Sequence, residues 1–235
     1  MLYVDEFLES LRTPVRHDVF NPWYESDPKH DAGPNGPKIR KKHFREYLSQ
    51  RIGHVNILLL GEALGYRGGH FSGIPMTSER ILLGPSAESV ARNFLFRRTS
   101  RVDLSPKGFI EPTGTFVWGE ILRAGLDPSS VLIWNMFPWH PYDPNEGMLT
   151  NRTPTDLELE RGVRPLKSLL NLVKPKMVIA VGKKAFQTAS GIGGRHLNSY
   201  TGASPQSLYE VRHPANGGGG KFRRQFRKIV SEFRP

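Results

Sequence analysis

The sequence contains no cysteine and no long apolar run, and both absences exclude classes of protein. Without cysteine the 235-residue chain cannot form disulfide bonds or bind a metal or an iron–sulfur cluster through thiolates. Its apolar runs, such as residues 55–60, are far shorter than the ~20 residues of a membrane-spanning helix. Asp5, Glu6 and Glu9 stand where a signal peptide carries basic residues. We therefore expect a cytoplasmic protein that makes no contact with a membrane.

Acidic residues are also scarce relative to basic ones. The chain has 22 Asp and Glu against 33 Lys and Arg, which gives a formal net charge of +11 at pH 7. Such an excess favours a polyanionic partner such as nucleic acid, because neutralising phosphates releases condensed counterions. General solubility is the alternative explanation of the charge. The 13 Phe, 7 Tyr and 4 Trp residues exclude a disordered polyelectrolyte and provide enough apolar material for one core.

Short apolar runs alternate with helical patterns along most of the chain. The runs predict strands at 55–60, 131–134, 177–181 and 208–211, and the clearest helical patterns lie at 86–96, 115–124, 156–172, 183–189 and 221–233. Near-continuous apolar strands are typical of a parallel sheet that is buried on both faces. We predict a single α/β domain at 51–235, a three-layer sandwich with a four-stranded parallel sheet and helices on both faces. Residues 1–50 are predicted to form an N-terminal helical and loop extension.

Polar residues follow three of these strands. Glu62 follows the first strand, Asn135 ends the second, and His213 follows the fourth. Because ligands bind at the carboxyl ends of parallel strands, we expect a carboxylate, an amide and an imidazole to converge on one edge. This set could recognise a small planar ligand.

Two common nucleotide-binding motifs are excluded by their spacing. A dinucleotide fingerprint needs Gly-x-Gly-x-x-Gly after the first strand, and Ala63 occupies its second glycine position. A phosphate-binding loop needs Ser or Thr after Gly-Lys, and Phe222 follows Gly220-Lys221.

A series of short motifs in the order of the chain points to one family. The motifs are Gly61-Glu62-Ala63-Leu64-Gly65, Gly73-Ile74-Pro75-Met76, Asn135 at a strand end, Asn151-Arg152-Thr153-Pro154 followed by Glu158, Val181-Gly182-Lys183-Lys184-Ala185, and His213-Pro214-Ala215. Together they resemble the uracil-DNA glycosylase superfamily, and most closely its iron–sulfur branch, whose first motif reads Gly-Glu-Ala-Pro-Gly. The resemblance covers about 55–233 and leaves out the first fifty residues.

The sequence departs from that branch at several positions. Trp139 and Gly162 stand where the branch has cluster-binding cysteines, and we expect aromatic packing to replace the cluster. Met76 stands where a Phe stacks on the base. Four glycines at 217–220 stand where the loop of the second motif carries an apolar wedge.

The resemblance implies a role for each polar residue at the strand ends. Asn135 would read the base, because one amide can pair with both N3–H and O4 of uracil and meets the reversed pattern in cytosine. His213 would donate a hydrogen bond to uracil O2 as negative charge develops on the leaving base. Glu62 would position the attacking water or stabilise the sugar cation. Ala63 stands where other branches have an activating Asp or Asn. His140 is a rival to His213, since it lies near Asn135 in sequence.

Further residues are predicted to bind the base and the DNA backbone. The predicted base pocket consists of Asn135, Gly61, Ala63, Gly65, Tyr66, Phe71 and Met76, and which of the last three stacks on the base stays open. The predicted DNA-binding residues are Gly217, Gly218, Lys221, Arg223 and Arg224, which would hold the backbone without reading sequence.

We therefore predict a monofunctional, monomeric DNA glycosylase. It would flip uracil out of DNA, hydrolyse the N-glycosidic bond and release free uracil from an abasic site, with no cofactor and no metal. One alternative is a glycosylase for another deaminated or mismatched base. Others are a non-catalytic protein that binds damaged DNA and a nucleoside hydrolase that acts on small molecules.

Overall fold

The elements follow one another as an alternation of strands and helices. The computed structural model describes residues 2–12, 16–85, 87–90, 92–93, 95–193 and 207–233. The strands are β1 (Val19–Phe20), β2 (Ile57–Ala63), β3 (Val131–Phe137), β4 (His140–Pro141), β5 (Met177–Val181) and β6 (Ser207–Val211). The helices are α1 (Leu2–Ser10), α2 (Gly36–Ser49), α3 (Gly69–Ser72), α4 (Glu79–Leu83), α5 (Ala87–Val90), α6 (Pro112–Arg123), the 3₁₀ turn η1 (Pro128–Ser130), α7 (Asp156–Val173), α8 (Lys183–Gly193) and α9 (Gly219–Glu232).

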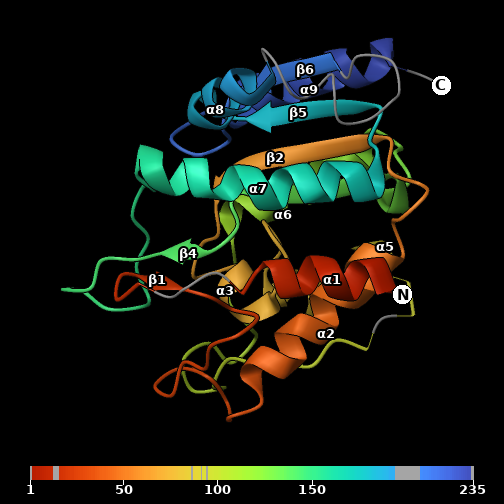
Figure 1. Cartoon of the computed structure of the whole chain (residues 1–235). Coiled ribbons are helices and arrows are strands. Elements are labelled where there is room, and N and C mark those ends of the chain that lie inside the picture. The colour runs from red at the N-terminus through yellow and green to blue at the C-terminus, as the bar shows by residue number, and fades with distance from the viewer. Residues whose placement is uncertain are drawn as a thin grey trace.

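Four parallel strands form the central sheet in the order β3-β2-β5-β6. Helix α7 crosses one face and α6 lies behind the sheet (Figure 1). Helix α8 packs beside α7, and ion pairs from Glu120 to Arg223 and Arg227 join α6 to α9. All residues of β3 and β5 are buried, as expected for strands covered on both sides. The predicted three-layer α/β fold with a four-stranded parallel sheet is confirmed.

One predicted helix is shorter than its sequence pattern. The pattern at 86–96 predicted one continuous helix, but α5 covers only Ala87–Val90. Asn93 has a φ of 52°, in the left-handed region, which no residue of a continuing helix adopts.

The described residues of the N-terminal segment, 2–12 and 16–50, contribute side chains that pack against the sheet. Strand β1 pairs with β4 in the antiparallel sense. The rings of Phe7 in α1, Trp23, and Phe44 in α2 lie 5.5, 6.1 and 5.5 Å from the ring of Trp134 in β3. All four residues belong to one buried core together with the sheet. The N-terminal segment is therefore part of the same folded unit.

The Asn-Arg-x-Pro motif has a structural role at the start of α7. Thr155 caps the helix in a capping box with Glu158. The guanidinium of Arg152 donates two hydrogen bonds to the Glu158 carboxylate, at 2.8 and 2.7 Å, and one to Asp18 at 2.7 Å. This paired geometry holds the pKa of Glu158 at about 2, although burial opposes the shift. The loop that precedes α7 is thereby fixed to the N-terminal segment.

The two positions that carry cluster-binding cysteines in the iron–sulfur branch are packed differently in this chain. The indole Nε1 of Trp139 donates a hydrogen bond to the Leu11 carbonyl at 3.0 Å, and its ring lies edge-on to Phe137 at 5.3 Å. Gly162 brings α7 directly onto β3, because a Cβ at this position would overlap the Met136 carbonyl oxygen and lie 2.7 Å from its carbon. No helix among the described residues is long and apolar enough to cross a membrane.

We expect Gly162→Ala to destabilise the protein strongly and Gly191→Ala to stabilise it slightly. The new methyl group at 162 would meet the backbone of β3, and such overpacking typically costs about 1–3 kcal/mol or more. Gly191 lies in α8 with open space around its Cβ position, so alanine there should add about 0.5–1 kcal/mol. Urea unfolding of the two variants measures both effects. Equal midpoints for the two variants would contradict the close contact between α7 and β3.

Candidate active site

The end of β2 lies directly against the amide of Asn135. Gly61 and Asn135 are register partners in the parallel pair of β2 and β3. A Cβ at position 61 would overlap Asn135 Oδ1 and lie 2.9 Å from Cε of Met76. Only glycine at 61 therefore leaves room for the amide and the thioether side by side, and the structure brings these three predicted site residues together.

The Asn135 side chain is buried and has no hydrogen-bond partner. Its exposed fraction is 1%, and both Oδ1 and Nδ2 are unpaired. Burial of an unpaired polar group costs about 1–3 kcal/mol per group, so nearly all buried polar atoms in folded proteins are paired. The Asn135 amide is therefore able to pair with a ligand that supplies a matching donor and acceptor.

Met76 is held in a strained backbone conformation beside this amide. Its φ of 46° lies in the left-handed region, where a non-glycine residue is unusual. Its carbonyl lies against Gly114 of α6, where a Cβ would be 2.8 Å from the Met76 carbonyl carbon. The next residue, Thr77, accepts a hydrogen bond from Trp118 Nε1 at 3.0 Å. Helix α6 thus packs against the backbone of Met76, while the Met76 side chain lies against Gly61.

Glu62 and Ala63 lie on opposite faces of β2. Side chains alternate along a strand, so Ala63 shares the face of Gly61 and the Asn135 amide, whereas Glu62 lies on the other face, toward Lys184 of α8. Burial raises the pKa of the half-buried Glu62 carboxyl, and the charge of Lys184 at the start of α8 opposes this shift. Glu62 therefore stands at the predicted edge but on the other side of the strand from the amide.

His213 follows β6 and is held in one tautomer. The backbone N–H of Ala215 donates to its Nδ1 at 3.1 Å, so the neutral ring carries its proton on Nε2. Burial lowers its pKa, and the neighbouring Arg212 adds to the effect. Gly182 lies against the His213 side chain, because a Cβ on Gly182 would be 3.3 Å from Cβ of His213. His213 thus offers a neutral N–H donor at the edge of the sheet that carries Glu62 and Asn135.

The loop after β2 brings the predicted aromatic residues into contact with one that the sequence did not indicate. Phe71 is fully buried and stacks on Phe109, with ring centroids 4.8 Å apart and an interplanar angle of 4°. Tyr66 meets Phe109 edge-on at 6.2 Å, and its N–H donates to Asn151 Oδ1 at 2.9 Å. A Cβ at Gly65 would contact the same Asn151 amide. Phe109 and Tyr66 are partly exposed, while the buried Phe71 packs against Phe109.

A buried chain of polar side chains lies behind this loop. His140 Nε2 donates to the Thr150 carbonyl at 2.8 Å, and its Nδ1 lies 3.0 Å from Nδ1 of His70 in α3. His70 Nε2 lies 3.1 Å from the carboxylate of Asp27. Burial lowers the pKa of His140 to about 3. Both ring nitrogens of His140 are therefore engaged within the protein, and the chain ties the β2–α3 loop to the N-terminal segment.

Glu111 is a second residue that the sequence analysis did not single out. Its carboxyl carbon lies 2.7 Å from the position that a Cβ on Gly68 would occupy, so Gly68 leaves the space that the carboxyl group fills. Its Oε2 is buried and has no hydrogen-bond partner. Burial raises its pKa to about 7. No motif marks Glu111, because it reaches the β2–α3 loop from the start of α6, more than forty residues later in the chain.

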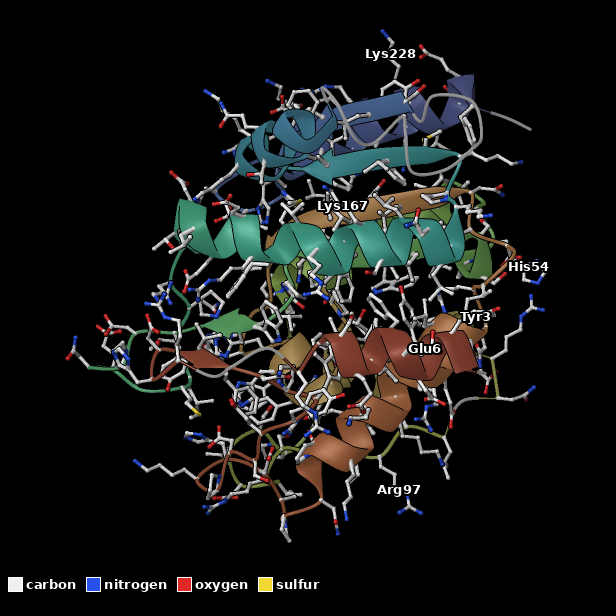
Figure 2. All side chains as sticks on the ribbon, in the orientation of Figure 1. Tyr3, Glu6, His54, Arg97, Lys167 and Lys228 are labelled. Atoms are coloured by element: carbon white, nitrogen blue, oxygen red, sulfur yellow. The ribbon has the colours of Figure 1, made fainter. Side chains whose placement is uncertain are left out.

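The predicted DNA-binding residues lie at and after the His213 loop. Gly217 has a φ of 73°, and a Cβ on Gly218 would overlap the His213 carbonyl oxygen. Lys221 and Arg224 are exposed on α9, whereas Arg223 donates to Glu120 at 2.8 Å. Farther along α9, Lys228 points outward (Figure 2). Within the described part of the chain, no cluster of three or more His, Cys, Asp or Glu side chains could hold a metal ion.

Comparison with known proteins places this geometry in a family. The family model of the uracil DNA glycosylase superfamily matches residues 48–234. Among solved structures, the chain is similar to the crystal structure of wild-type Pedobacter heparinus SMUG2, with a TM-score of 0.62 and 13% identity over 98% of this chain and 97% of that one. At this level of identity the likeness shows the fold alone. No curated protein matches significantly.

We expect Glu111→Gln to stabilise the folded protein in a pH-dependent way. The folded-state pKa of about 7 lies above the ordinary 4.5, so ionisation of Glu111 opposes folding once the pH exceeds 4.5. Removing the charge should therefore raise the free energy of unfolding by up to about 3 kcal/mol at pH 8. The gain should shrink as the pH falls below 7 and vanish near pH 4.5.

Urea unfolding at pH 5, 6.5 and 8 measures this dependence. Glu160→Gln on α7 is the control, because its carboxyl is exposed. An equal effect of Glu111→Gln at all three pH values would contradict the burial of an unpaired carboxyl group.

Proposed function

Because this chain belongs to the uracil-DNA glycosylase superfamily, a family of base-excision-repair glycosylases that act on DNA, we propose that it hydrolyses the N-glycosidic bond of uracil in DNA. The reaction would leave an abasic site and release free uracil. We further propose that the protein acts as a monomer in the cytoplasm and flips the nucleotide into the edge formed by β2, β3 and β6.

The unpaired amide of Asn135 is the observation that carries this proposal. Its two buried polar atoms need a ligand that presents one donor and one acceptor side by side. N3–H and O4 of uracil have this arrangement, and cytosine presents an acceptor and a donor at the same positions. Met76, next to the amide, would contact the face of the base.

His213 is proposed to stabilise the leaving base. Its Nε2–H would donate to uracil O2, and this hydrogen bond strengthens as negative charge develops on the base. The hydrogen bond from Ala215 to Nδ1 and the lowered pKa both support a neutral ring with the proton on Nε2. Since such a donor acts mainly in the transition state, its loss should lower the rate more than the affinity for DNA.

The remaining predicted residues are assigned by their positions at the same edge. Glu62 is proposed to stabilise the positive charge that develops on the sugar, as a carboxylate at the carboxyl end of β2. Gly217, Gly218, Lys221 and Arg224 are proposed to hold the DNA backbone, since exposed lysine and arginine side chains and close backbone approach suit phosphates. Arg223 is also proposed to hold the DNA backbone, and it would do so while its guanidinium is paired with Glu120.

A related activity on another deaminated base is the second candidate. Met76 provides a flexible thioether instead of a flat ring next to the base position, and the partly exposed rings of Tyr66 and Phe109 lie across the loop. A pocket with an adaptable wall could admit a larger base such as hypoxanthine.

We expect the purified protein to release uracil from single- or double-stranded oligonucleotides in the presence of EDTA. Alkali would then cleave the abasic product, and gel electrophoresis would quantify the fragments. Matched thymine and cytosine oligonucleotides are the controls, and a hypoxanthine oligonucleotide tests the second candidate. No product from any uracil substrate at stoichiometric protein would reject uracil as the substrate.

We expect Asn135→Ala and His213→Ala to lower the single-turnover rate by about 100-fold or more, because each loses hydrogen bonds to the base. Binding of uracil-containing DNA, measured by fluorescence anisotropy, should change little, since backbone contacts supply most of the affinity. Asn135→Ala should also keep the free energy of unfolding within about 1 kcal/mol of wild type, because it removes two unpaired buried atoms.

Asn145→Ala is the matched control for asparagine, because its exposed side chain lies in the loop before α7. A protein that binds damaged DNA without turnover would show no uracil-dependent cleavage in wild type or in any variant.

A further inference from the structure

Hydrolysis of the glycosidic bond needs a group that accepts a proton from the attacking water, and the first motif does not supply one on the face of the base. Ala63 lies on the face of Gly61 and the Asn135 amide, but its methyl group cannot accept a proton. Glu62 lies on the opposite face of β2, toward Lys184. A carboxylate for this task must therefore come from another element that reaches the same side of the sheet.

Glu111 reaches that side from the N-terminus of α6. The side chain does not cap its own helix, although it occupies the N-cap position. Instead its carboxyl group lies in the space that Gly68 leaves in the β2–α3 loop. Its Oε2 is also 3.4 Å from the position that a Cβ on Gly114 would occupy, and the Met76 carbonyl meets the same position.

One residue, Met76, separates Glu111 from Asn135. The Met76 side chain lies against Gly61 next to the Asn135 amide, and the Met76 backbone lies against Gly114 next to the Glu111 carboxyl group. The Asn135 amide thus lies near the side chain of Met76, and the Glu111 carboxyl group lies near its backbone. Met76 is the residue that would contact the face of the base. A pyrimidine whose N3 edge pairs with Asn135 has its sugar at the opposite end of the ring from O4, and therefore directs the sugar away from the amide.

A purely structural role does not account for this carboxyl group. Its buried Oε2 has no hydrogen-bond partner, and burial alone raises its pKa. The unpaired Glu111 carboxylate opposes folding at neutral pH, because a buried charge without a partner is costly. If Glu111 only filled space, an uncharged side chain in its place would make the protein more stable. Groups of this kind are typical of catalytic acids and bases.

We propose that Glu111 is the general base of this enzyme and accepts the proton of the water that attacks C1′ of the deoxyribose. This assignment rests on the proposed glycosylase function. As the C1′–N1 bond breaks, its electron pair leaves with the base, which the Nε2–H of His213 stabilises. The water oxygen bonds to C1′ and its proton passes to Glu111 Oε2. The base anion later takes up one proton, so water is added across the bond and no co-reactant is needed.

The pH dependence of single-turnover cleavage tests this role. With excess protein on a uracil oligonucleotide, we expect the wild-type rate to rise with pH and to level off above pH 7, where Glu111 is ionised. Glu111→Gln should lower the plateau rate by about 100-fold or more. Its remaining pH dependence should have a midpoint below 7, because the site groups that still titrate are then His213, whose pKa is lowered from 6.5, and Glu62, whose pKa burial raises from 4.5 against the charge of Lys184. The half-saturating protein concentration should stay within threefold of wild type.

Two further variants separate a catalytic role from a structural one. Glu111→Asp retains the carboxylate one methylene farther back and should recover part of the rate together with the pH dependence. Glu25→Gln is the matched control, because Glu25 also has a buried unpaired oxygen and a pKa raised by burial, but lies in the N-terminal segment. Glu25→Gln should leave both the rate and its pH dependence unchanged.

The outcomes distinguish the two proposals. Cleavage by wild type with a Glu111→Gln rate within threefold would overturn the general-base assignment and leave the glycosylase function intact. A Glu111→Gln plateau that falls while the midpoint stays at about 7 would also overturn it, because another group would then control the titration. Wild-type protein that cleaves neither uracil nor hypoxanthine substrates would reject the glycosylase function itself.

Discussion

The close approach of β2 and β3 at Gly61 is the constraint on which the rest of the site depends. The missing Cβ at Gly61 lets the Asn135 amide and the Met76 side chain lie together at the carboxyl end of the sheet. The Asn135 amide is thereby buried without a hydrogen-bond partner. This burial lowers the stability of the folded protein, and a purely structural role does not account for it. Two further contacts hold this arrangement in place. Helix α6 packs against the backbone of Met76, and Gly162 lets α7 pack directly on β3.

The N-terminal segment has a larger part in this arrangement than its position in the sequence suggests. The indole of Trp139 bonds to Leu11, and Phe7, Trp23 and Phe44 surround Trp134 on the face of β3 opposite to Asn135. Aromatic packing around Trp134 thus supports β3, and the indole hydrogen bond of Trp139 ties the residues just after β3 to the N-terminal segment. The strand that presents the amide is therefore held from its other side by residues that lie outside the family motifs.

The sequence was sufficient to predict the fold and to place three of the predicted site residues at strand ends, but it did not indicate the loop residues that pack beside them. Four apolar runs predicted the four parallel strands, and strand ends located Gly61, Asn135 and His213 at one edge. Glu111 and Phe109 escaped prediction because they precede α6 and reach the β2–α3 loop only through tertiary packing. Side chains alternate along β2, which puts Glu62 on the opposite face from the Asn135 amide. This separation could be derived only from the extent of β2 and its register with β3.

The same alternation explains why a carboxylate from α6 suits this chain. Neighbouring side chains of a strand point to opposite faces of the sheet, so Glu62 lies toward Lys184 of α8 and Ala63 lies on the face of Gly61 and the Asn135 amide. Burial raises the pKa of Glu62 and the charge of Lys184 opposes that shift, whereas the pKa of Glu111, whose buried Oε2 has no hydrogen-bond partner, is raised by burial alone. The two carboxyl groups therefore differ in whether a cation balances their negative charge. A carboxyl group beside a cation suits the electrostatic role proposed for Glu62, and one with a pKa raised to about 7 suits the proton transfer proposed for Glu111 near neutral pH.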